Sequence, residues 1–119
     1  MKPSKTAESA TVGNFEEHVM LAVLRTDPEA YGMNVRRELE KVTSRSVTIG
    51  SVYITLDRLE AKGFVTSSRT AEAQSRRLFS VTPSGARALA ETRAMRDRLW
   101  AGVDLGALGA LGALGALGA

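Results

Sequence analysis

The spacing of apolar residues along the chain predicts four helices and one pair of short strands. The first helix runs from about Phe15 to Thr26, with Asn14 and Glu17 at the spacing of a capping box. Its middle, V-M-L-A-V-L, is apolar on almost every side. Such a helix has to be covered on more than one side, which a domain of this size hardly achieves alone. The pattern therefore already indicates a second subunit.

A second helix is expected from about Tyr31 to Val42, and after a short polar turn a third helix follows from Thr48 to Gly63. Two helices joined in this way are typical of a helix-turn-helix. The third helix has an apolar stripe formed by Ile49, Val52, Leu56 and Leu59, and a polar stripe formed by Ser51, Thr55, Arg58 and Lys62. Hydroxyls and cations with few acids suit the bases and phosphates of a DNA major groove. We therefore interpret this segment as a recognition helix.

Behind the third helix the pattern changes to that of a β-hairpin. Residues 64–69 and 76–81 favour strands, and six polar or small residues between them favour a turn. A hairpin in this place is a wing, and Arg69, Arg76 and Arg77 flank its tip. These cations suit phosphates or the minor groove, although arginine also protects the edges of exposed strands.

The fourth helix begins at Thr82 and Pro83, a typical helix start, and runs to about Gly102. Its apolar line ends at Leu99 and Trp100, which are candidate contacts for a second subunit or a ligand. Because the hairpin already closes the small domain, this long helix is best used between subunits.

The last fifteen residues are five copies of Leu-Gly-Ala. They carry no side chain for chemistry, and they are too short to span a bilayer, which needs about 20 apolar residues. The expected class is mostly helical α+β, a winged helix-turn-helix with three helices, a two-stranded wing and a long C-terminal dimerisation helix. We expect a flexible tail at 1–13, the DNA-binding domain at 14–82, the dimerisation helix at 83–104 and a low-complexity tail at 105–119.

Composition narrows the function classes. The net charge is +3, and between residues 43 and 82 six bases stand against three acids, so a polyanion is the natural partner. The chain has no cysteine and a single histidine, His18, which excludes disulfides and a Cys/His zinc site. It lacks a partnered nucleophile and a glycine-rich phosphate loop, so we expect neither an enzyme nor a bound cofactor. The polar N-terminus has no signal-peptide pattern, so we expect a cytoplasmic protein without membrane contact.

Four segments form a specific combination. They are F-E-x-H-V-M-L-A-V-L in the first helix, A-Y-G at 30–32, I-G-S-V-Y-I-T-L-D-R-L-E-A-K-G at 49–63 and V-T-P-S-G at 81–85. Together they resemble the PadR family of bacterial transcriptional regulators, over about residues 14–103. The resemblance implies a homodimer, paired through the C-terminal helix, that binds an inverted repeat in double-stranded DNA and usually represses. The Leu-Gly-Ala repeat departs from the family pattern.

The resemblance also implies roles for single residues. Its DNA-reading helix contains Ser51, Tyr53, Thr55 and Arg58, its wing contains Arg69, Arg76 and Arg77, and its second helix starts at Tyr31.

Several of these residues have a second interpretation. Arg58 and Lys62 either contact DNA or only face solvent, and Tyr53 and Tyr31 either reach a phosphate or pack against the protein. Trp100 either packs in a dimer interface or stacks on a small aromatic effector, as the resemblance to some PadR-like regulators implies. For the whole protein, the alternative to a DNA-binding regulator is a winged helix that serves as a protein-interaction module.

Overall fold

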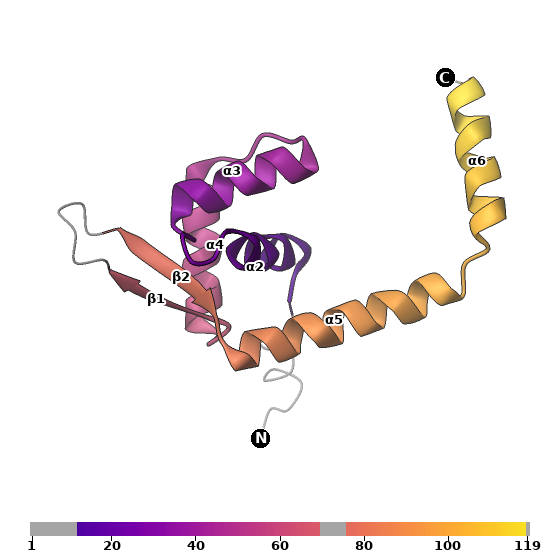
Figure 1. Cartoon of the computed structure of the whole chain (residues 1–119). Helices are drawn as coiled ribbons and strands as arrows, with labels where there is room; N and C mark the ends of the chain where they lie inside the picture. The colour runs from indigo at the N-terminus through magenta and orange to yellow at the C-terminus, as the bar shows by residue number, and fades with distance from the viewer. Residues whose placement is uncertain (1–11, 70–75, 119) are drawn as a thin grey trace.

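The computed structural model describes residues 12–69 and 76–118, which form five helices and a two-stranded antiparallel sheet (Figure 1). In chain order the elements are α2 (Asn14–Thr26), α3 (Gly32–Thr43), α4 (Ile49–Ala61), β1 (Val65–Arg69), β2 (Arg77–Val81), α5 (Pro83–Ala101) and α6 (Leu105–Gly118). The predicted class, a mostly helical winged helix-turn-helix, is confirmed. The predicted turn at 70–75 and most of the predicted N-terminal tail lie outside the described residues.

Local capping residues explain where the helices begin. Helix α2 starts one residue earlier than predicted, so its third residue is Glu16, which accepts a hydrogen bond from the Gly13 N–H at 2.8 Å. The expected capping box of Asn14 and Glu17 is therefore wrong. Helix α4 starts as predicted, with the Thr48 hydroxyl accepting from the backbone N–H of Ser51 at 3.2 Å.

The core lies where α2, α3 and α4 meet one side of the hairpin. Its fully buried side chains include Val19, Met20, Val35, Val52, Leu56, Leu59 and Phe79. Strand β2 is also attached through its backbone, because the N–H of Phe79 donates to the carbonyl of Ala30 at 2.9 Å. Helix α4 and the wing therefore share one core, which fixes them relative to each other.

Helix α5 leaves this core after its first half. Gly85 and Ala88 are buried, and a Cβ on Gly85 would clash with the carbonyl oxygen of Phe64. From Asp97 to Gly115 every residue is exposed. Figure 1 shows the end of α5 and all of α6 extending away from the other helices and the hairpin.

The Leu-Gly-Ala repeat forms α6, a helix that begins where Asp104 Oδ1 accepts from the Ala107 N–H at 3.0 Å. The repeat contains only leucine, glycine and alanine, so α6 has no polar side chain on any face. The described leucine side chains are exposed. Across residues 12–69 and 76–118, no helix combines the length and the apolar character that crossing a bilayer requires.

Candidate nucleic-acid interface

Helix α4 presents a different face to solvent from the predicted one. Its apolar stripe is covered as expected, but Thr55 is also buried, with only 5% of its surface exposed. The predicted polar stripe lies beside the apolar stripe, about a quarter turn from the true outer face, so α2 and the hairpin cover part of it. The prediction that Thr55 reads bases is therefore wrong. The outer face consists of Gly50, Tyr53, Ile54, Asp57, Arg58 and Ala61.

Ile54 is the residue that sequence reasoning missed. Its side chain is 59% exposed in the middle of the outer face of α4. Arg58 lies one turn further along the same face and is also exposed. An apolar group and a guanidinium in this arrangement match a thymine methyl and the acceptor edge of guanine.

Ser51 occupies the first turn of α4 and is half-buried. Its hydroxyl donates to the Thr48 carbonyl at 2.8 Å and accepts from the Thr48 hydroxyl at 3.0 Å. These bonds orient the hydroxyl at the end of the helix that carries the partial positive charge of the macrodipole. Ser51 thus stays a prediction for DNA contact, as a residue of the helix start.

Lys62 does not face outward. Its ammonium donates to both carboxylate oxygens of Glu16 at 2.9 Å, and 21% of its side chain is exposed. Burial alone would raise the pKa of the Glu16 carboxyl, but the Gly13 N–H, the Lys62 ammonium and the Arg58 charge together hold it below its usual value. The predicted phosphate contact of Lys62 stays a prediction, and in this structure the residue connects the end of α4 to the start of α2.

Arg77 is likewise used inside the protein. Its Nη2 donates to Asp57 Oδ1 at 3.2 Å and to Glu60 Oε1 at 2.9 Å, and its guanidinium lies 4.8 Å from the centre of the Phe79 ring. These contacts attach β2 to α4 and pair Asp57 on the outer face with a cation that Glu60 shares. The predicted phosphate contact of Arg77 stays a prediction, and Arg69, which lies opposite Arg77 across the strands, is exposed.

Two tyrosines and an arginine gather around the start of α3. The Tyr53 ring lies against Gly32, so closely that a Cβ on Gly32 would clash with the ring and its hydroxyl. Tyr53 therefore packs against the second helix, yet 36% of it stays exposed. The Arg76 guanidinium stacks over the ring of Tyr31, which precedes Gly32, at 4.5 Å. Hydroxyls, a guanidinium and the N–H groups of a helix start form a surface suited to one phosphate.

A substitution at Gly32 tests whether this surface binds a phosphate. In the Gly32→Ala variant, the new methyl group must displace the Tyr53 ring, which is the movable end of a side chain. We expect a small change in thermal stability but clearly weaker DNA binding, because the Tyr53 hydroxyl leaves the start of α3. Melting followed by circular dichroism and fluorescence anisotropy with labelled DNA measure the two effects. Unchanged affinity would contradict a phosphate contact at Tyr53, and Tyr53→Phe is the matched variant that removes the hydroxyl alone.

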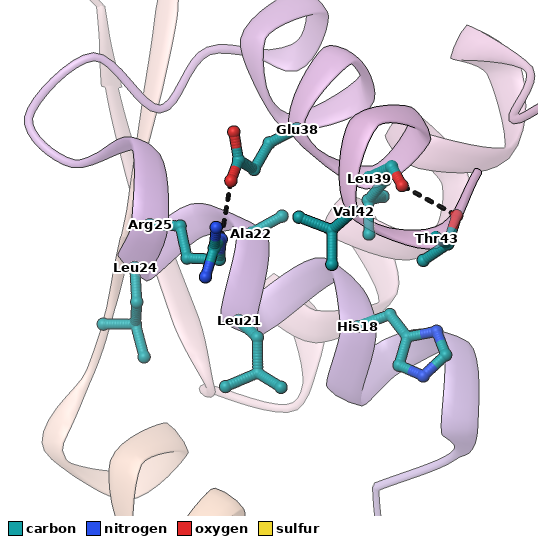
Figure 2. Close-up of a pocket in the computed structure, with 9 residues that line it drawn as sticks. All are labelled: His18, Leu21, Ala22, Leu24, Arg25, Glu38, Leu39, Val42 and Thr43. Carbon is teal, nitrogen blue, oxygen red and sulfur yellow. Dashed lines mark hydrogen bonds and ion pairs between the residues drawn. The ribbon is translucent and has the colours of Figure 1, made fainter. Parts of the chain in front are cut away.

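A second surface lies nearer the C-terminal end of α3, between α2 and α3. The lining residues enclose an apolar hollow of about 450 Å³. Figure 2 shows the Arg25–Glu38 ion pair on one side of it and His18 on the other. Arg25 Nε donates to Glu38 at 2.6 Å, and this bond holds the pKa of the Glu38 carboxyl below its usual range. The apolar side chains around the hollow include Leu21, Leu24, Leu39 and Val42.

Apolar residues are also exposed at the C-terminal end of α5. Leu99 is 66% and Trp100 55% exposed, and both border a hollow of about 200 Å³ with Val103 and Leu108. Neither residue contacts the outer face of α4. The described structure therefore separates a polar, cationic surface on α4, α3 and the wing from apolar surfaces on α2 and α5.

Comparisons with known proteins find similar chains among transcriptional regulators. The chain is 38% identical over 74 residues to transcriptional regulator Rv3488 of Mycobacterium tuberculosis, covering 61% of this chain and 68% of that protein. A PadR family transcriptional regulator from Eggerthella lenta has 26% identity and a TM-score of 0.61, covering 76% of this chain and 79% of that one. A PadR-like transcription factor from Bacteroides fragilis has the same fold, with 22% identity and a TM-score of 0.64 over 83% of this chain and 92% of that one.

The family comparison covers the winged helix and the first half of α5. Residues 20–91 match the profile described as the transcriptional regulator PadR-like family. This range contains α3, α4, both strands and the buried glycine of α5. The family consists of regulators and not of enzymes. Since the match extends over more than half of the chain, the protein belongs to the PadR-like family of transcriptional regulators.

Proposed function

We propose that this transcriptional regulator binds double-stranded DNA as a homodimer, on an inverted repeat, and acts as a repressor. The observation that carries the proposal is the outer face of α4. Its one acid, Asp57, is paired with Arg77, which Glu60 shares, while Arg58 and Ile54 stay exposed. A face that carries a cation and an apolar side chain, without an unpaired acid, can approach base edges in the major groove.

The proposed contacts divide into two groups. Ile54, Arg58 and Ser51 face the bases, and Arg58 bonded to guanine would discriminate by about 1–3 kcal/mol. Tyr53, Tyr31 and Arg76 bind a phosphate with the start of α3, and Arg69 approaches the backbone from the wing. The phosphate contacts fix the position of the protein, and the base contacts select the sequence.

Dimerisation is proposed from the apolar surfaces. The end of α5 exposes Leu99 and Trp100, and α2 exposes Leu21 and Leu24 beside the hollow. Surfaces of this kind on one small domain mark contacts between subunits. Two recognition helices would then read half-sites about 34 Å apart, or a multiple of this distance. Sedimentation equilibrium should find a dimer at micromolar concentration, and a monomer would contradict the proposal.

A salt series tests DNA binding and separates it from the protein-interaction alternative. Binding to the promoter region upstream of the gene should weaken steeply as salt rises, because each neutralised phosphate releases counterions. Arg76→Ala should weaken binding to specific and random DNA alike and lower the salt slope by about one. Arg93→Ala, which removes an exposed base of α5, is the control and should leave the slope unchanged. No binding at low salt would contradict the DNA-binding function.

A further inference from the structure

The first turn of α2 is connected to two separate parts of the protein. Glu16 binds Lys62 at the end of α4, and the next residue, Glu17, binds Arg96 in α5. Both acids are buried, with 8% of their surface exposed. One helical turn therefore positions the recognition helix and the C-terminal helix together.

Arg96 is the last contact of α5 with the winged helix. Its Nη2 donates to Glu17 Oε1 at 2.6 Å and to Asn14 Oδ1 at 2.9 Å. Its Nε is buried and has no acceptor among the described residues. The protein therefore covers this part of the guanidinium as well as the part that forms the ion pair. Beyond Arg96, every residue of α5 from Asp97 onward is exposed. Contacts N-terminal to it on α5, at Gly85, Ala88 and Leu89, act as the other point that holds the helix.

A helix held at two points has a fixed direction, and a helix held at one point can swing. From Ala88 to Ala101 the helix measures about 20 Å, so a swing of about 15° around Ala88 would move its end by about 5 Å. One base pair advances along DNA by about 3.4 Å. A swing of this size would therefore displace the end of α5 by more than one base-pair step.

We propose that Arg96 is a positioning residue that fixes the direction of α5 relative to α4 and thereby selects the spacing between DNA half-sites. The proposal rests on the proposed dimer, because α5 relates the two recognition helices only when two copies pair through it. Lys62 and Glu16 contribute by holding α4 to the same turn of α2. Arg96 touches no base or phosphate in this arrangement and acts through the geometry of the dimer.

Spin labels can measure this geometry because the chain has no cysteine. Ala61→Cys places one label at the exposed end of α4, and pulsed dipolar spectroscopy then reports the distance between the two recognition helices of a dimer. Adding Arg98→Cys and diluting with unlabelled protein reports the direction of α5 within one chain. In both experiments we expect a narrow distribution for the unsubstituted Arg96.

Arg96→Gln and Glu17→Gln should each broaden both distributions and shift them by about 5 Å, the movement expected from a swing of the helix end. Arg96→Lys, which keeps the charge, should restore part of the narrow distribution, and Arg93→Gln is the matched control that should change nothing. Melting followed by circular dichroism verifies that each variant is folded; if Arg96→Gln unfolds, Asn14→Ala removes one acceptor and serves in its place.

The two experiments separate the proposals. No dipolar signal from the single label would contradict the dimer alone, since the intrachain pair still reports the direction of α5. Narrow, unshifted distributions in Arg96→Gln and Glu17→Gln would overturn the positioning role. With a dimer present, a binding series over half-site spacings completes the test, because Arg96→Gln should bind neighbouring spacings nearly equally where the unsubstituted protein prefers one.

Discussion

Replacing Gly85 with alanine is expected to lower the free energy of unfolding by about 1–3 kcal/mol, the usual effect of overpacking a well-packed core. Alanine favours a helix over glycine by about 1 kcal/mol, but this gain is smaller than the cost of the clash. The new Cβ would meet the Phe64 carbonyl oxygen, which is backbone and is held by the Thr82 N–H at 3.0 Å. Met20 Cε, at 2.9 Å, closes the other side.

Gly50→Ala is the matched control, because Gly50 also lies in the first turn of a helix. A Cβ there meets nothing within 4 Å, so the same substitution should stabilise by about 0.5–1 kcal/mol. Chemical denaturation of both variants measures the difference in sign. Equal stabilisation by both substitutions would mean that α5 does not approach Phe64 as closely as described, and the direction of α5 would then need another explanation.

The helices, their caps and the buried stripe of α4 could be predicted from sequence because they depend on local spacing. Thr48, Gly63 and Thr82 lie within a few residues of the groups they cap. Gly63 has a left-handed backbone, with a φ of 80°. A glycine directly after a helix predicts this conformation, so the single residue is enough to expect it. Information of this kind is present in any short window of the chain.

The partners of the cations could not be predicted in the same way. Glu16 and Lys62 are 46 residues apart, and Glu17 and Arg96 are 79 apart. Nothing in the sequence distinguishes Lys62, which is paired, from Arg58 on the same helix. Tertiary packing alone decides which cations remain available for a phosphate.

The outer face of α4 could have been predicted from sequence, but the polar residues of the helix predict the wrong face. They form a stripe that lies beside the buried stripe and not opposite to it. Measuring the angle from the centre of the apolar stripe instead places Ile54 opposite to it, between Gly50 and Arg58 on the outer face. The apolar character of Ile54 concealed it, because an isoleucine in a helix is usually assigned to the core.

Ile54→Glu is expected to weaken binding to all DNA by at least about tenfold, because like charges brought together in an interface cost several kcal/mol. The carboxylate would stand in the middle of the face that we propose approaches the major groove. Stability should hardly change, since the side chain is 59% exposed. Ile54→Ala removes only the apolar contact, so it should weaken binding mainly at sites with thymine in the corresponding position.

Ala86→Glu supplies the control for Ile54→Glu, because it adds the same charge at an exposed position near the start of α5. Both variants change the net charge equally, so any long-range loss of attraction to DNA is common to them. Anisotropy titrations at one salt concentration isolate the local effect as the ratio of the two affinities. A ratio near one would show that Ile54 does not face DNA, and the reading surface would then have to lie elsewhere than on the outer face of α4.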